Sequence, residues 1–277
     1  MTATFHGVRG STPCCSDEIT RYGGNTSCVA LDIPGHSPVL FDLGTGLRYY
    51  GQAQPADEPF RGTCLLSHLH WDHIQGLPFF KPLLHEGADV KIYAPVQEDS
   101  ASVAEVFAET IKPPLFPIHF SMFPGMVEFH EVGDSEFTIG EITVTTRFIP
   151  HVGNTIGYRV EWNGQSVVYM SDHQMPVDGS HTASPGVFDL CQGADLLIHD
   201  AQYTRQEFAQ KTTWGHCTPE YAVWLAAEAG VKRLALFHHD PAHDDDQLDE
   251  MLGAAIECAS RLGVDAFAAR ERTTVTI

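Results

Sequence analysis

The chain has 277 residues, of which 43% are hydrophobic and 19% are charged, and this composition excludes an intrinsically disordered protein. It carries 16 Lys and Arg against 36 Asp and Glu, and the net charge of −20 disfavours extended contact with nucleic acid or an anionic membrane. No stretch reaches the ~18 consecutive apolar residues that a membrane-spanning helix requires.

The N-terminal residues have neither the basic nor the apolar segment of a secretory signal, so we expect a cytoplasmic protein. Seven cysteines are scattered along the chain without the C-x-x-C spacing of a zinc knuckle or a redox pair. We therefore expect reduced thiols in a reducing compartment. The oligomeric state does not follow from the sequence, and a homodimer is compatible with it.

Short apolar runs separated by Gly and Pro predict strands along most of the chain. These runs cover residues 27–33, 38–43, 62–67, 90–94, 126–132, 142–149, 155–162, 166–171, 195–199 and 234–237. No repeat, low-complexity tract or linker divides the sequence. We therefore expect a single domain over residues 1–277, with a mixed α/β body whose sheets are covered by helices.

Helical signals are clearest in the last third of the chain. Thr218 is a predicted N-cap, and the helix that follows it ends at Gly230. Asp244 is a second predicted N-cap, and apolar residues with helical spacing continue from it until Gly263. The Pro-rich residues 112–124 are the best candidate for an inserted loop, and the sequence leaves their role open.

Three histidines and an aspartate are concentrated in HLHWDH, residues 68–73, directly after a predicted strand. His68 and His70 can point the same way where the chain is extended, and Asp72 and His73 can approach from the turn that follows. Zinc and similar divalent metals favour imidazole and carboxylate ligands, and a catalytic site keeps one position open for water. Polar residues at a strand end are the alternative, but this density of ligand types favours a metal site.

Three further residues of the same types also stand at the ends of apolar runs: His151, Asp172 and His238. Each alone is more often an ordinary surface or core residue. Their shared placement at predicted strand ends favours one common site. His239 is the alternative to His238, because the two are adjacent and the register is uncertain by one residue.

The HLHWDH stretch resembles the H-x-H-x-D-H signature of the metallo-β-lactamase superfamily, and the later His151, Asp172 and His238 fall in the family's order. The resemblance covers nearly the whole chain and implies an α/β (α+β) fold, a four-layer αββα sandwich with a two-metal site between the sheets. It implies two divalent metal ions, with zinc expected and manganese or iron as alternatives. By this resemblance His68, His70 and His151 hold one metal, Asp72, His73 and His238 hold the second, and Asp172 bridges them.

Other stretches are similar to the ribonuclease Z branch of this superfamily and to related bacterial phosphodiesterases. They are GVRGSTP (7–13), RYGGNTS (21–27), DLLIHDA (195–201) and GHCT (215–218). The last two correspond to H-E-A-T and G-H-S-T in that branch, with Asp200 in place of Glu and Cys217 in place of Ser. The resemblance implies hydrolysis of a phosphodiester.

Three residues are the predicted catalytic groups: Asp72, which is also an expected ligand, His216 and Asp200. A histidine with a near-neutral pKa, held by a carboxylate such as Asp200, could protonate a poor alkoxide leaving group. A thiolate leaving group needs no such acid. The alternative for His216 is a loop residue before a helix. Asp42 is expected either to orient a ligating histidine or to be a plain turn carboxylate.

The expected substrate is a small phosphodiester, with a 3′,5′-cyclic nucleotide preferred, attacked by a metal-bridging hydroxide. Ribonuclease Z commonly carries an arm between the positions matching His151 and Asp172, which here are only 21 residues apart. No long nucleic acid and no membrane partner is therefore expected. The alternatives are a ribonuclease Z-like RNA endonuclease and an acyl hydrolase, either a thioesterase or a lactonase. Phe116, Phe120 and Phe123 are expected to form an apolar wall for a base or to pack in the core.

Overall fold

A computed structural model describes residues 1–98 and 101–277 and contains two seven-stranded sheets. The first sheet consists of β1 (Thr2–Gly7), β2 (Cys28–Asp32), β3 (Val39–Phe41), β4 (Arg61–Leu65), β5 (Asp89–Pro95), β6 (Met126–Val132) and β14 (Thr274–Thr276). The second consists of β7 (Ser135–Ile139), β8 (Ile142–Phe148), β9 (Ile156–Trp162), β10 (Gln165–Met170), β11 (Leu196–Asp200), β12 (Arg233–Phe237) and β13 (Asp265–Ala268). Their orders are β14-β1-β2-β3-β4-β5-β6 and β13-β12-β11-β10-β9-β8-β7.

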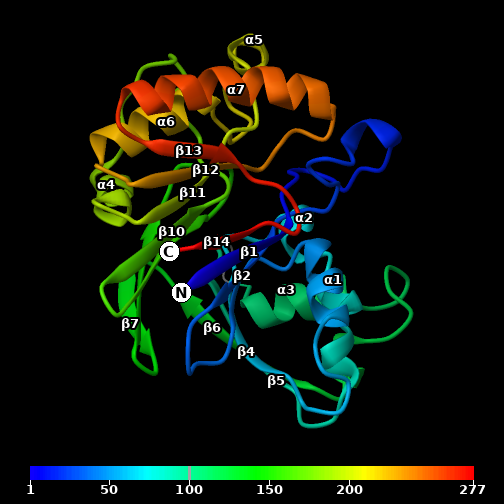
Figure 1. Ribbon diagram of the computed structural model, residues 1–277. Coiled ribbons are helices and arrows are strands. Elements are labelled where there is room, and N and C mark those ends of the chain that lie inside the picture. Colours follow the sequence, from blue (N-terminus) through cyan, green and yellow to red (C-terminus); the bar gives the residue numbers. More distant parts are fainter. Residues whose placement is uncertain (99–100) are drawn as a thin grey trace.

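Helices cover the outer face of each sheet (Figure 1). The α-helices are α1 (Gly46–Gln52), α2 (Trp71–Ile74), α3 (Val103–Thr110), α4 (Pro185–Cys191), α5 (Arg205–Phe208), α6 (Pro219–Glu228) and α7 (Asp245–Arg261). Short 3-10 helices cover Asp17–Ile19, Leu77–Phe79, Lys81–Leu84 and Phe120–Met122. The first sheet carries α1 and α3, and the second carries α4, α6 and α7, so the predicted αββα sandwich is confirmed.

The central strands are buried on both faces. In β10, Val167 and Tyr169 lie in the core between the sheets, whereas Val168 and Met170 pack under the helices. A strand with two buried faces needs apolar residues at nearly every position, which is why these strands appear in the sequence as continuous apolar runs. The strands from β3 to β6 and from β10 to β13 are parallel, so the carboxyl ends within each group meet at one edge.

The connection between β9 and β10 is a two-residue turn. Asn163 and Gly164 have φ values of 49° and 76°, the left-handed conformation that a tight hairpin requires and that Asn-Gly adopts readily. The chain between His151 and Asp172 is therefore a plain hairpin, as its length predicts. Within residues 1–98 and 101–277, no helix combines the length and the apolar character needed to cross a membrane.

Candidate metal centre

The residues of HLHWDH are placed by a change from extended chain to helix. His70 still has an extended backbone, with φ −64° and ψ 152°, and α2 begins at the next residue. Both imidazoles of the extended part therefore turn to one side, while Asp72 and His73 lie in the first turn of the helix. The rings of His68 and His73 approach to 4.2 Å between centroids.

Three imidazoles form a first group at this point. The Nδ1 atom of His70 lies 2.9 Å from Nε2 of His68 and 3.2 Å from Nε2 of His151. A single ring proton can satisfy only one of these pairs, whereas a cation would be bound by all three nitrogens at once. Asp172 Oδ2 completes the group at 3.8 Å from His68 Nε2 and 3.7 Å from His151 Nε2.

A second group lies on the other side of Asp172. Nε2 of His73 is 3.2 Å from Asp72 Oδ2, 3.1 Å from Asp172 Oδ1 and 3.3 Å from His238 Nε2. The Oδ1 atom of Asp172 is buried and accepts no hydrogen bond in the described part of the chain. A buried carboxylate oxygen without a donor, facing imidazole nitrogens, fits a position that a cation would occupy. Asp172 thus faces both groups, as a bridging ligand would.

Hydrogen bonds on the outer side of the rings fix which nitrogen faces inward. The outer nitrogens bond from His68 Nδ1 to Ser67 Oγ (3.0 Å), from His73 Nδ1 to Asp42 Oδ2 (2.6 Å), from His151 Nδ1 to Gly215 O (2.7 Å) and from His238 Nδ1 to Gln202 Oε1 (2.8 Å). Each Nδ1 atom thus has a partner outside the cluster, so the Nε2 atom of each of these rings faces the centre. Metal-binding histidines are oriented in the same way in other proteins.

Asp42 supports the cluster through hydrogen bonds to His73 and to residues behind it. Besides His73, its carboxylate accepts hydrogen bonds from the Ser67 backbone N–H (2.7 Å), the Ser67 hydroxyl (2.9 Å) and the Tyr169 hydroxyl (2.7 Å). Asp42 is fully buried and has a φ of 57°, and this uncommon backbone conformation is maintained by these hydrogen bonds. Of its two expected roles, the structure favours orientation of a histidine.

The charges of the cluster favour a divalent cation. Burial raises the pKa of Asp72 and Asp172, but the facing histidines outweigh it and hold both carboxyl pKa values below the usual range. Burial lowers the pKa of His151 to about 4. Burial also favours a lower pKa for His73, but the charges of Asp72, Asp172 and Asp42 outweigh it. The pKa of His73 therefore lies above its usual value. Ionised carboxylates beside imidazoles, of which His68, His70 and His151 favour the neutral form, make up the donor set of zinc, manganese or iron.

His216 and Asp200 form a pair at the edge of this cluster. Nδ1 of His216 lies 2.8 Å from Asp200 Oδ2, and Asp200 is itself held by the backbone N–H groups of Gln202 (2.9 Å) and His173 (3.3 Å). Burial alone would lower the pKa of His216. The charge and hydrogen bond of Asp200 raise it by more, so the net shift of the His216 pKa is upward. His216 also lies within ligand distance of Asp172 and His238. The arrangement thus suits either a proton donor or a further ligand.

At the end of β12, His238 faces the cluster and His239 does not. His239 points away and bonds through Nε2 to the Ala269 carbonyl at 2.9 Å. The close packing around His238 also explains one glycine of the N-terminal motif, because a Cβ on Gly10 would lie 2.3 Å from the His238 ring. Gly215 is constrained in the same way: it has a φ of 96°, and a Cβ there would lie 2.3 Å from the His151 ring.

All nine residues predicted as ligands or catalytic groups are thus brought together. The supporting partners Gln202, Ser67, Tyr169 and Gly215 were not predicted. An opening leads to the centre, and it is lined by Ser11, Leu69, His70, Trp71, Asp72, Asp172 and His216.

Comparisons with known proteins agree with this geometry. The beta-lactamase superfamily domain matches residues 38–239. A ribonuclease Z from Synechococcus sp. (strain CC9311) is 27% identical, and the match covers 88% of this chain and 88% of the relative.

Two solved structures share the fold over nearly their full length. The short form of human tRNase Z superimposes with a TM-score of 0.68 at 22% identity, covering 100% of this chain and 99% of that one. Unliganded yeast PDE1 gives a TM-score of 0.70 at 13% identity, with coverage of 100% and 99%. Identities this low establish the common fold and leave the substrate open.

Proposed function

Because the chain belongs to the beta-lactamase superfamily and is a metal-dependent hydrolase of that fold, we propose that it hydrolyses phosphodiester bonds. One observation carries the choice of bond. A buried carboxylate and histidine, Asp200 and His216, form a 2.8 Å pair at the edge of the metal centre. Phosphodiester hydrolysis releases an alkoxide, a poor leaving group that needs a proton in the transition state.

Two divalent cations, with zinc proposed first, would supply positive charge to the phosphoryl oxygens and lower the pKa of a bound water. Each remaining step belongs to a side chain of this protein. The Nδ1 atom of His216 is engaged by Asp200, so the proton for the leaving oxygen is held on Nε2. The backbone donors to Asp200 fix that carboxylate, and through it the plane of the His216 ring. Asp72 is held in turn by the Ser11 backbone N–H at 2.7 Å.

An acyl hydrolase is less well supported. A thioesterase releases a thiolate, which leaves without protonation, so the pair of Asp200 and His216 would have no task in that reaction. A lactone also releases an alkoxide, so the pair argues against a thioesterase only, and it is the ribonuclease Z relative that favours a phosphodiester over a lactone. The fixed, buried position of Asp200, with several donors directed at it, argues for a demanding proton transfer.

Among phosphodiesters, the relatives support an RNA endonuclease of the ribonuclease Z type better than they support a cyclic nucleotide phosphodiesterase. The Synechococcus ribonuclease Z matches 88% of this chain. The human tRNase Z and yeast PDE1 structures are similar to this chain to nearly the same degree, so they do not separate the two candidates.

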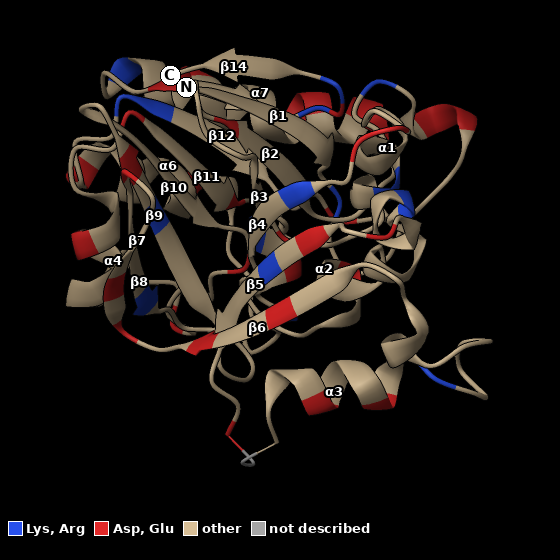
Figure 2. Cartoon of the chain, turned by 90° about the horizontal axis from the view of Figure 1, so that it is seen from below, with Lys and Arg blue, Asp and Glu red and all other residues tan. Residues whose placement is uncertain are grey.

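Features of this chain itself support a smaller substrate, which stays the second candidate. The alignment with the Synechococcus relative spans 293 positions, more than the 277 residues of this chain, so that relative carries segments absent here. The two-residue turn at Asn163 and Gly164 leaves no arm between His151 and Asp172. Acidic residues recur on α3 and β6 (Figure 2), and the net charge of −20 opposes a long polyanion.

The test is metal analysis of the purified protein followed by turnover assays. The phosphodiesters are bis-p-nitrophenyl phosphate, 3′,5′-cyclic AMP and a precursor transfer RNA, and the acyl controls are a thioester and a lactone. We expect metal-dependent turnover of at least one phosphodiester and of neither acyl compound. Preferred cleavage of the RNA identifies the first candidate, and preferred turnover of cyclic AMP identifies the second. Turnover of an acyl control alone contradicts the proposal.

A further inference from the structure

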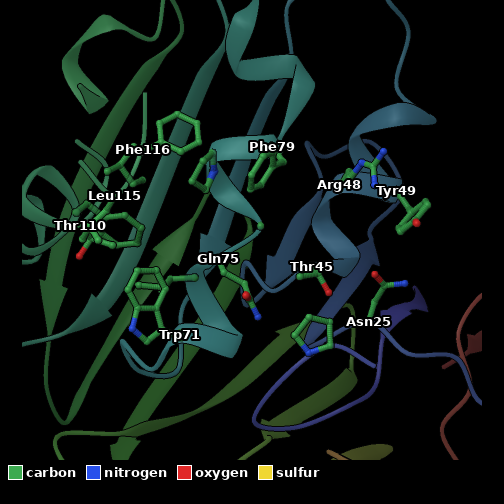
Figure 3. A pocket seen from close by; sticks show the side chains of 16 residues that line it. Asn25, Thr45, Arg48, Tyr49, Trp71, Gln75, Phe79, Thr110, Leu115 and Phe116 are labelled. Carbon is green, nitrogen blue, oxygen red and sulfur yellow. The ribbon is translucent and has the colours of Figure 1, made fainter. Parts of the chain in front are cut away.

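A cleft of about 670 Å³ opens beside the metal centre and shares Trp71 with the opening that leads to it. Figure 3 shows its two ends. Leu115 and Phe116 lie at one end together with Thr110, and Arg48, Tyr49 and Asn25 lie at the other, with Gln75 and Thr45 between them. We call this space the aromatic cleft. Its apolar end is formed by Trp71, Phe79, Leu115 and Phe116, its polar end by Asn25 and Arg48, and its middle by Thr45 and Gln75.

The apolar end gathers large side chains that are exposed to solvent. Trp71 and Phe79 are each 59% exposed, and Leu115 is 69% exposed. Exposed apolar groups gathered in one concave place mark a binding site rather than ordinary surface. Trp71 stands between His70 and Asp72 in the chain, so any group that reaches the metal centre from this side lies next to its ring.

The walls of the apolar end are fixed by packing. The rings of Phe79 and Phe116 meet edge to face at 5.9 Å, and Phe116 stacks on the nearly buried Phe123 at 6.3 Å. This contact gives the Pro-rich residues 112–124 a role, because they carry one wall of the cleft. Of the three phenylalanines expected to form a wall or to pack, Phe116 lines the cleft, while Phe120 and Phe123 pack against the core.

The polar end carries a positive charge without a counter-ion. Arg48 is exposed and forms no ion pair with residues of the described ranges 1–98 and 101–277. Most other arginines in this acidic protein are paired, as Arg21 is with Asp246 and Asp249 at 2.7 Å. A free guanidinium at the end of a cleft is suited to an anionic group of a ligand.

Resting on the proposed phosphodiesterase activity, we propose that the aromatic cleft binds one nucleotide of a linear oligonucleotide, adjacent to the phosphodiester at the metal centre. Its base stacks against Trp71 beside the paired rings of Phe79 and Phe116, and its next phosphate reaches Arg48. Aromatic side chains stack on any base, so this subsite does not select sequence. A cyclic mononucleotide has no second phosphate for Arg48, so the cleft favours a linear substrate over a cyclic one.

The first experiment measures binding without turnover. Calorimetry on the metal-loaded protein compares AMP with ribose 5-phosphate, which keeps the phosphate and lacks the base. We expect Trp71→Ala to weaken AMP binding by about 5- to 150-fold, the range for loss of one base stack, and to leave ribose 5-phosphate within about twofold. Trp71→Phe should recover most of the affinity. The matched control is Trp214→Ala, a tryptophan that is 62% exposed and lies outside the cleft.

Equal losses for AMP and ribose 5-phosphate in Trp71→Ala, or no loss for either, would overturn the base subsite. The second experiment compares hydrolysis of the linear dinucleotide pApA by the wild type and Arg48→Gln. We expect Arg48→Gln to raise KM for pApA at least about fivefold while the Kd of AMP stays unchanged. An unchanged KM refutes the role of Arg48. Binding is measured apart from turnover. A protein that binds AMP in the cleft yet cleaves no phosphodiester would therefore contradict the proposed function and support the base subsite.

Discussion

The two sheets contribute to the metal centre in different ways. The first sheet supplies four candidate ligands from six consecutive residues, placed by one transition from strand to helix. The second supplies His151, Asp172 and His238 from the ends of three different strands, together with the pair of Asp200 and His216. The aromatic cleft lies on the first side and the proposed proton donor on the second. In the proposed mechanism, one half of the sandwich would position substrate by local structure, and the other would perform proton chemistry through tertiary packing.

The largest expected effect is the same for a candidate ligand from either sheet. His73 and His238 come from different sheets but face one another at 3.3 Å in the same group. We expect His73→Ala and His238→Ala each to lose one metal and to reduce activity beyond the about 10- to 100-fold that follows loss of a residue that only orients a ligand. Metal content and kcat/KM are the measurements. His239→Ala is the control, and loss of metal from that variant would contradict the assignment.

The next effect concerns the second sheet alone, through His216. We expect His216→Ala to reduce kcat by about 10²- to 10⁴-fold with an alkoxide leaving group, and to retain its metal. With p-nitrophenolate, which leaves without a proton, the loss should be much smaller. The comparison of dinucleotide and bis-p-nitrophenyl phosphate turnover provides the measurement. An equal loss on both substrates, accompanied by loss of metal, would show that His216 is a ligand.

A smaller effect, on metal affinity, is expected at Asp42. Asp42→Asn removes the charge that accepts the Nδ1 proton of His73, so that ring is less firmly held and less basic. We expect metal affinity to fall by about 10- to 100-fold, measured by competition with a chelator. Tyr169→Phe removes only one of the hydrogen bonds to Asp42 and serves as the graded control. An affinity unchanged in Asp42→Asn would reduce Asp42 to a purely structural role.

The smallest effect lies away from the chemistry, at the start of β11. Burial raises the pKa of Asp195, but the Lys232 hydrogen bond and the Ser166 N–H outweigh it and lower the pKa. A lowered folded-state pKa stabilises the protein above the unfolded value of about 4, and the effect is lost as pH falls through the folded value. Asp195→Asn should therefore cost about 1 kcal/mol at neutral pH, and the difference should vanish in acid, as measured by denaturant unfolding. Activity should not change.

The same contrast explains what the sequence could predict about the fold. Strands buried on both faces, such as β10 and β12, appear as apolar runs and were predicted within a residue or two. The strands β1, β7, β13 and β14 were missed because exposed or half-exposed positions interrupt them, so their apolar residues do not form long runs. The helix α3 was also missed, although Ser102 and Glu105 form a capping box.

For the candidate site, the local spacing of residues 68–73 was enough to predict that the side chains from the first sheet lie together. The side chains from the second sheet were predicted from their order along the chain. The choice between His238 and His239 needed the structure, because His238 adopts a φ of 59° that turns its side chain toward the centre. Gln202 and Tyr169 carry no local signal. Each meets its partner, His238 or Asp42, only through packing of distant strands.

The buried carboxylate of Asp42 has a thermodynamic consequence. It accepts hydrogen bonds from Ser67 at the end of the first sheet, from Tyr169 in the second and from His73 in the centre. Contacts that join the sheets are therefore the contacts that orient a ligand, so occupancy of the centre and cooperativity of unfolding are linked. A cation at 100 times its Kd adds about 2.7 kcal/mol to the stability of the folded state. The melting temperature of this protein should therefore report how fully its metal centre is loaded.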